Sequence, residues 1–171
     1  SKMDEDQARE IFSKQYADRR RDQPAFWDDE RFNNPSHPVV GVNWFEASAY
    51  CMWLDKQWHA SENSMPNGVV RLPTEAEWEK SARLNRGWVY PWGNSWELDH
   101  ANTEEAHLVA TSPMGIFATG ATPEGVYDMS GNVWEWTTTL YKKYPYRFDE
   151  THEDPNNTND PRVLRGGSWI L

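Results

Sequence analysis

Two helix-start signals set the framework of this 171-residue sequence. Each is a polar residue followed three residues later by a glutamate, and the two pairs are Asn43 with Glu46 and Thr74 with Glu77. At this spacing the first side chain accepts a hydrogen bond from the glutamate's backbone N–H, and the glutamate carboxylate accepts one from the backbone N–H of the first residue. The sequence therefore predicts helices over residues 45–58 and 75–85. Tyr50, Trp53 and Leu54 share one stripe of the first helix, as in an amphipathic helix.

The remaining segments predict short elements joined by turns. The 11 prolines and 10 glycines are spread along the chain, which argues against a helical bundle. Apolar residues at helical spacing predict another amphipathic helix over residues 4–21. Residues 39–42 are predicted to form a short buried strand, residues 162–169 a strand with a glycine kink, and residues 141–160 a long surface loop.

The charge balance excludes some classes of partner. The formal net charge is −10, so no overall positive field is present to hold a nucleic-acid backbone, and we expect no nucleic-acid partner. No apolar stretch approaches the ~20 residues that span a bilayer. The N-terminus as given is acidic and does not resemble an export signal. We therefore expect a soluble chain without membrane insertion, and the sequence indicates no particular location.

The chain is rich in tryptophan although it is polar. It has 11 tryptophans and a mean hydropathy of −0.92. A polar chain with so many large rings is expected to build its core from a few of them, with each buried N–H or O–H hydrogen-bonded.

A single cysteine, Cys51, limits the possible chemistry. One thiol cannot form an internal disulfide or a two-thiol site within this chain. Cys51 is therefore predicted to be a small buried apolar residue.

The histidines show no H-x-H or H-x-x-x-H spacing, so no iron or zinc site is predicted at His37, His59, His100, His107 or His152.

Five blocks, in this order, carry a family resemblance: VVGVNWFEA at 39–47, RLPTEAEWE at 71–79, YPWG at 90–93, GNVWEWT at 131–137 and LRGGSW at 164–169. Together they resemble the formylglycine-generating enzyme, or sulfatase-modifying-factor, family. The resemblance implies an α+β, C-type-lectin-like fold with two capped helices, a small twisted antiparallel sheet and abundant loop. Residues 1–171 are then expected to form one such domain, without the N-terminal strands and the C-terminal segment that the family usually has.

The family includes oxidases that make formylglycine, the lectin-like half of sulfoxide synthases, and variable proteins diversified by retroelements. Fold alone therefore does not decide function. The oxidases use two copper-binding cysteines, whereas this chain has one, so we expect no copper in this chain. Enzyme activity of this chain alone is disfavoured but left open. The resemblance favours a ligand- or protein-binding module of the variable-protein type, with the diversified segment after Trp169 absent. The alternative is an oxidase whose cysteine-bearing C-terminus is missing from this chain.

A calcium site is predicted around a glycine turn. Two carboxylates with intervening backbone carbonyls supply the oxygen ligands that Ca²⁺ prefers. Matched to the family's second calcium site, the ligands are the side chains of Asp128 and Glu135 and the carbonyls of Gly131 and Val133. Asp128 stands where the oxidases commonly have asparagine, and its added charge is expected to tighten binding. The alternative is that the two acids cap turns or pair with an arginine such as Arg165.

A first calcium site would map to Asn102 and Thr103, followed by Ala106 and Leu108. Ala106 replaces the acid that the family has at this position. This site therefore needs Glu104 or Glu105 as a substitute.

A ligand surface is predicted from aromatic residues: Tyr141, Tyr144, Tyr146 and Trp169. Tyrosines among acids and asparagines are typical of adaptable contact surfaces, although an ordered loop without a ligand would have the same composition. Trp134 and Trp136 share one face of a predicted strand, where core packing is favoured over a sugar-stacking platform. The expected partner is a protein or a small-molecule or carbohydrate ligand.

Overall fold

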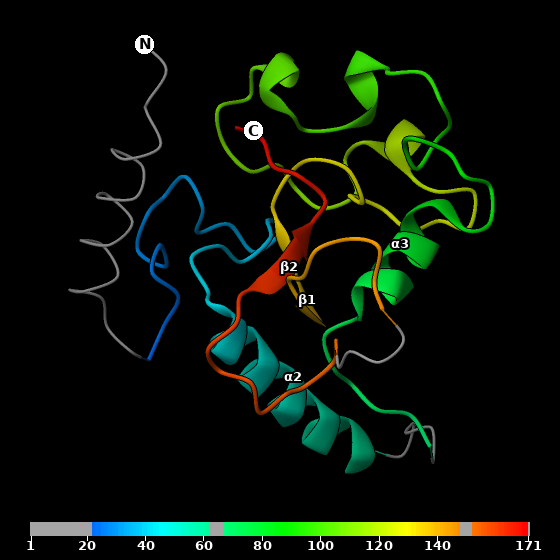
Figure 1. The fold of residues 1–171 in the computed structure, drawn as a ribbon. Coiled ribbons are helices and arrows are strands. Elements are labelled where there is room, and N and C mark those ends of the chain that lie inside the picture. Colours follow the sequence, from blue (N-terminus) through cyan, green and yellow to red (C-terminus); the bar gives the residue numbers. More distant parts are fainter. Residues whose placement is uncertain (1–21, 62–66, 148–151, 171) are drawn as a thin grey trace.

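The computed structural model describes residues 22–61, 67–147 and 152–170 of the chain (Figure 1). The helix predicted over residues 4–21 lies outside these described residues. Across the described ranges, no helix is both long enough and apolar enough to cross a membrane.

Both predicted capped helices are confirmed. Helix α2 spans Trp44–His59 and helix α3 spans Glu75–Arg83, and each begins with a complete capping box. Three 3₁₀ turns follow in the loop-rich half of the chain: η1 at Leu98–His100, η2 at Glu104–Ala106 and η3 at Ala118–Gly120. In Figure 1 these turns lie at the end of the molecule opposite α2.

The described residues form a sheet of two antiparallel strands. β1 spans Glu135–Leu140 and β2 spans Arg162–Arg165. The register pairs Glu135 with Arg165 at one end, and it is irregular toward the other. Gly166 and Gly167 follow β2 with φ of 96° and 79°, which is the predicted glycine kink.

Residues 39–42 do not form the predicted strand. They run as irregular chain into α2, and Gly41 adopts a φ of 75°. Their backbone groups bond to a loop and a side chain instead of a neighbouring strand: the Gly41 carbonyl accepts from Ala25 N at 3.0 Å, and the Val42 carbonyl accepts from Trp136 Nε1 at 3.1 Å. A run of valines fits a buried strand, but among the described residues no strand pairs with it.

The core is smaller than the aromatic composition suggests. The buried apolar residues of the described chain are Ala82, Ala101, Met129, Leu140 and Val163. The tryptophans instead lie partly covered around this core, where several indole N–H groups find oxygen acceptors, as expected. These donors are Trp44 to Thr137 O, Trp78 to Glu135, Trp92 to Ser95 O and Trp136 to Val42 O.

Helix α3 is tied to the sheet by polar contacts. Glu75 N donates to Thr139 Oγ1 at 2.8 Å, and Thr138 N donates to Pro73 O at 2.8 Å.

Helix α2 is covered less completely: Tyr50 and Trp53 of its predicted stripe are 60% and 53% exposed. Cys51 is partly buried rather than fully buried, because α2 places no residue in the fully buried core.

Candidate functional site

Asp128 lies in a tight turn just before β1. Its backbone is left-handed, with φ of 57°, and its Oδ2 accepts a hydrogen bond from Gly115 N at 2.6 Å. Gly131 follows with φ of 81°, and its N–H donates to Gly166 O at 2.7 Å. The kinked segment after β2 therefore holds the turn that carries Asp128.

Glu135 is the first residue of β1 and is largely withdrawn from water. Its Oε2 accepts from Trp78 Nε1 at 2.5 Å. Burial raises the pKa of Glu135, the Trp78 hydrogen bond opposes that shift, and the negative charge of Asp128 adds to it. Arg165 lies opposite Glu135 in the sheet register, but its guanidinium forms a salt bridge with Glu75.

These residues fit a cation site in their donor chemistry. Two acids repel each other in a poorly solvated position, and a divalent cation would relieve that repulsion. Within the described part of the chain, the carbonyls of Gly131 and Val133 accept no hydrogen bond. The described residues hold no group of three or more His, Cys, Asp or Glu arranged for a metal, so an ion here would need these carbonyls beside Asp128 and Glu135. Calcium binding stays a prediction.

The residues of the first predicted calcium site divide into a buried and an exposed part. Asn102 is 1% exposed, and its Nδ2 donates to Ala110 O at 2.9 Å, while its Oδ1 is buried without a hydrogen-bond partner. An unpartnered buried oxygen is the kind of group that a cation would satisfy. Thr103 donates its hydroxyl to Glu105 at 2.6 Å, and this bond lowers the pKa of the Glu105 carboxyl. Ala106 offers no side-chain ligand, so this donor set is poorer than the one around Asp128.

The structure brings two of the predicted ligand-binding tyrosines together. The hydroxyls of Tyr144 and Tyr146 both donate to the carboxylate of Glu75, and their rings stack at 4.7 Å between centroids. Glu75 is 4% exposed and also pairs with Arg165, which donates to Tyr144 Oη at 3.0 Å. Because both hydroxyls are engaged, only the ring of Tyr144, which is exposed, is free to meet a ligand.

The other predicted residues lie apart from this cluster. Tyr141 is 66% exposed and belongs to no aromatic contact among the described residues. Trp169 packs against Phe32, with 6.3 Å between ring centroids. Trp134 is exposed over about half of its surface (49%), so the core packing favoured for it is wrong. The structure therefore does not join the four predicted residues into one surface.

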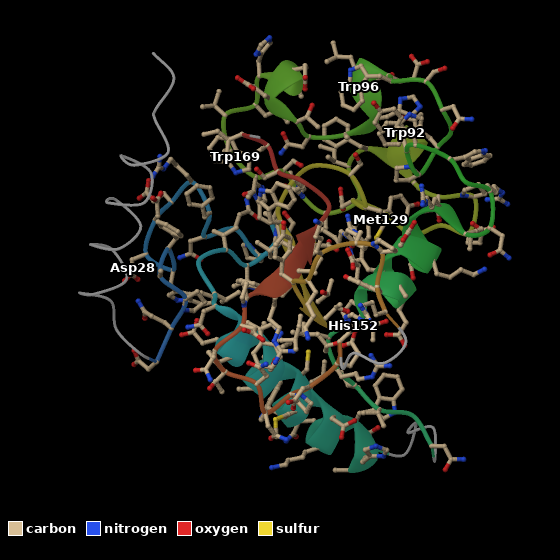
Figure 2. All side chains as sticks on the ribbon, in the orientation of Figure 1. Asp28, Trp92, Trp96, Met129, His152 and Trp169 are labelled. Carbon is tan, nitrogen blue, oxygen red and sulfur yellow. The ribbon has the colours of Figure 1, made fainter. Side chains whose placement is uncertain are left out.

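A cavity that the sequence did not predict is lined in part by Phe32, the ring against which Trp169 packs. It measures about 300 Å³, and the loop before α2 forms its walls (Figure 2 labels Asp28 on this loop). Its lining is mainly aromatic and proline, with a few polar groups: Pro24, Phe26, Trp27, Phe32, Asn33, Asn34, Pro35, His37, Pro38, Val39 and Val40. The curvature of this loop around the cavity depends on contacts from distant parts of the chain.

Those contacts fix the cavity walls. His37 Nδ1 lies 2.9 Å from Thr111 Oγ1, and Ser36 O accepts from Met114 N at 2.8 Å. A Cβ at Gly41 would lie 2.6 Å from the Phe26 ring, so glycine allows the loop to close here. The cavity is thus held by the fold rather than by the loop alone.

The fold and the site define a small, loop-rich α+β domain of C-type-lectin-like type, with a preformed aromatic cavity. A family model described as "Sulfatase-modifying factor enzyme 1-like domain" matches residues 6–171, and the chain belongs to this family.

The relatives differ in activity. The chain is 37% identical over 144 residues to the "Inactive C-alpha-formylglycine-generating enzyme 2" of Bos taurus, covering 78% of this chain and 38% of that protein. It is 36% identical over 152 residues to the formylglycine-generating enzyme of Streptomyces coelicolor, covering 80% and 43%. It is 31% identical over 168 residues to the hercynine oxygenase of Mycolicibacterium thermoresistibile, covering 86% and 34%. The chain therefore spans less than half the length of each.

A solved structure shares the fold. Treponema denticola variable protein 1 superimposes with a TM-score of 0.62 at 23% identity, covering 80% of this chain and 61% of that one. At this identity the likeness shows the fold alone.

Proposed function

We propose that this chain is a ligand-binding module of the formylglycine-generating-enzyme-like family, and that its ligand enters the aromatic cavity of the loop before α2. The cavity carries the proposal, because its volume of about 300 Å³ suits a sugar ring or a small apolar group. The rings of Trp27 and Phe32 offer flat faces for such a group, and the Asn33 amide offers polar contacts.

The scaffold beneath the cavity supports this proposal. Ser36 O and His37 bond to Met114 and Thr111 in another part of the chain, and Gly41 O bonds back to Ala25 within the loop, so the walls are already placed before a ligand arrives. A preformed site loses less conformational entropy on binding than a flexible one. Such a cavity on a rigid fold is the arrangement expected of a recognition module.

The environment of Cys51 supports binding rather than oxidation for these residues. It is the single cysteine of the sequence, it lies in α2, and burial raises the pKa of its thiol. A raised pKa disfavours the thiolate that copper ligation and nucleophilic chemistry need. The rival function, a formylglycine-generating or related oxidase completed by a cysteine-bearing segment, draws its support from the 36% identity to the Streptomyces enzyme.

We also propose that calcium binds at Asp128, Gly131, Val133 and Glu135 and stabilises the module. The raised pKa of Glu135 beside Asp128 supports a cation at this position. Calcium here would have a structural role, since it would hold the turn before β1 to the start of the strand.

Saturation-transfer NMR with a panel of methyl glycosides and small aryl glycosides tests the binding proposal. We expect saturable transfer to at least one probe in the wild-type chain, and a weakening of at least tenfold in Trp27→Ala. Tyr141→Ala is the matched control, because it removes an exposed aromatic side chain that does not line the cavity. Absence of binding across the panel, or a Trp27→Ala variant that binds as the wild type does, would overturn the proposal.

A separate assay decides between binding and oxidation. The chain is incubated with a cysteine-containing peptide, copper and oxygen, and the peptide mass is followed. We expect no conversion, and formation of formylglycine would favour the oxidase.

A further inference from the structure

Helix α2 carries an apolar face that stays exposed in the described part of the chain. Its outer side bears four large apolar side chains that are each more than half exposed: Phe45 (53%), Tyr50 (60%), Met52 (63%) and Trp53 (53%). The rings of Tyr50 and Trp53 contact each other, with 5.6 Å between their centroids. Monomeric proteins rarely expose a connected apolar patch of more than a few hundred Å², and larger patches mark interaction sites.

The other side of α2 holds the helix on the domain. Trp44 Nε1 donates to Thr137 O at 3.0 Å, and the Arg162 guanidinium lies 4.2 Å from the centroid of the Trp44 ring. Asp55 Oδ1 accepts from Val70 N at 2.7 Å. Trp44 and Asp55 are three helical turns apart and therefore lie on the same side of α2. The exposed face is thus not the face through which these contacts attach the helix.

The spacing along the exposed face is that of a helix pair. Phe45, Ala49, Met52 and Lys56 follow one another at intervals of four, three and four residues, and all four are exposed. Side chains at this spacing form the seam along which two helices pack. In an antiparallel pair of α2 helices, Ala49 of each copy meets Met52 of the other, and Phe45 meets Lys56. The small Ala49 lets the helices approach, and the Lys56 ammonium can lie over the Phe45 ring. The face is therefore complementary to itself, as a two-fold symmetric interface requires.

The exposed area is close to what a dimer needs. A fully buried aromatic side chain covers about 150–250 Å², so three half-exposed rings leave roughly 100 Å² each. With Met52, Ala49 and the stem of Lys56, each copy offers about 500 Å², and two copies together bury about 1,000 Å², near the lower limit of a specific interface. A weak dimer that depends on protein concentration is therefore expected.

We propose that α2 is a self-association surface, and that two copies of this chain pair through it in antiparallel orientation. A lipid surface suits this face less well. Helices that lie on membranes are rich in lysine and arginine, whereas α2 has one lysine and the chain has a formal net charge of −10. The proposal uses none of the residues that line the aromatic cavity, so it does not depend on the function proposed for that cavity.

Oxidation by hydrogen peroxide tests the proposal with an internal control. Met52 and Met114 are almost equally exposed, at 63% and 61%, and Met114 lies in the segment between η2 and η3, far along the chain from α2. Peptide mass mapping follows the sulfoxide formed at each methionine. We expect the oxidation rate of Met52 relative to Met114 to fall severalfold as the protein concentration is raised, because pairing covers Met52 and leaves Met114 open.

The same ratio separates the possible occupants of the face. A ratio that stays high at every concentration means that the face is free, and a ratio that stays low means that the chain itself covers it. Either result overturns the proposal, since a second copy covers Met52 only when the concentration permits pairing.

Sedimentation velocity measures the dimer directly. We expect the wild-type chain to shift from a 20.0 kDa monomer to a species of twice that mass as its concentration rises toward the millimolar range. The double variant Phe45→Gln/Met52→Gln should weaken this association at least tenfold. Leu98→Gln is the matched control, because Leu98 is similarly exposed (55%) but belongs to η1, at the end of the molecule opposite α2 in Figure 1.

A wild-type chain that stays monomeric at every concentration overturns the proposal. So does a double variant that associates as Leu98→Gln does, because the dimer would then form through another surface. A thermal melt of each variant confirms that it is folded.

Discussion

Replacing Gly131 by alanine gives the sharpest test of how the turn before β1 is built. Gly131 has φ of 81°, and a Cβ there would lie 2.3 Å from the carbonyl oxygen of Asn102. That oxygen accepts a hydrogen bond from Asn132 N at 2.7 Å, and both asparagines are buried. The substitution must therefore displace a backbone carbonyl and weaken a buried hydrogen bond, in addition to imposing a left-handed backbone on alanine.

Gly125→Ala is the matched control. Gly125 has nearly the same φ, 82°, but a Cβ there meets nothing within 4 Å. Each substitution incurs about 1–2 kcal/mol for the left-handed conformation. Only Gly131→Ala adds the cost of a disrupted buried hydrogen bond, about 1–3 kcal/mol. Gly131→Ala should thus lower the free energy of unfolding by about 1–3 kcal/mol more than Gly125→Ala does.

Urea unfolding followed by tryptophan fluorescence measures both variants. The buffer contains a chelator, so that a change in calcium affinity does not enter the comparison. If the two variants lose the same stability within about 0.5 kcal/mol, the close approach of Gly131 to the Asn102 carbonyl does not add to the cost of a side chain at Gly131, and the reasoning is refuted.

The remaining predictions concern calcium, pH and helix capping. Chelation should lower the melting temperature, and calcium at 100 times its dissociation constant should restore about 2.7 kcal/mol; a melt insensitive to both would remove the metal proposal. Asp128→Asn should weaken but not abolish this effect, since it removes one charge and keeps an oxygen ligand. Because the pKa of Glu135 is raised above its ordinary 4.5, its stabilising contribution is present below pH 4.5 and lost as pH rises through the folded pKa. In chelator, Glu135→Gln should remove that loss, which unfolding at a series of pH values would detect. Thr74→Ala should lower the free energy of unfolding by about 1 kcal/mol, and an unchanged urea midpoint would contradict the capping role. Hydrogen bonds from Arg71 and from the backbone of Thr74 hold the pKa of Glu77 at about 2, so its contribution should be present above pH 4.5 and lost as pH falls toward 2; Glu77→Gln should lack this acid-side loss.

The sequence predicted the parts of the fold that depend on near neighbours. Both helices start where Asn43 and Thr74 cap them, because a capping box needs only residues three positions apart. The kink after β2 was likewise visible in two adjacent glycines, Gly166 and Gly167.

The strand predicted over residues 39–42 failed for a physical reason. Alternating or apolar runs show that a segment suits a strand, but they do not supply a partner strand. Here Gly41 turns the chain with a positive φ, and the Phe26 ring occupies the space where a Cβ would lie. The ring contact joins residues 15 positions apart in the sequence, so it cannot be predicted from residues 39–42 themselves.

In the candidate sites too, residues that lie close together in the sequence could be predicted, and contacts between distant residues could not. The four residues of the predicted calcium site lie within eight positions of one another, so a local motif could indicate them. The cluster of Tyr144 with Glu75 joins residues 69 positions apart, and no local pattern predicts such a contact. The aromatic cavity was missed for the same reason, since His37 reaches its wall position through Thr111, which is 74 positions away.

The most direct test of the binding function is a crystal of the wild-type chain soaked with the tightest-binding glycoside of the panel. We expect electron density for the probe in the cavity, with its ring against Trp27 or Phe32. A probe that binds in solution but occupies another surface, or a cavity filled by the chain's own side chains, would contradict a binding role for the cavity.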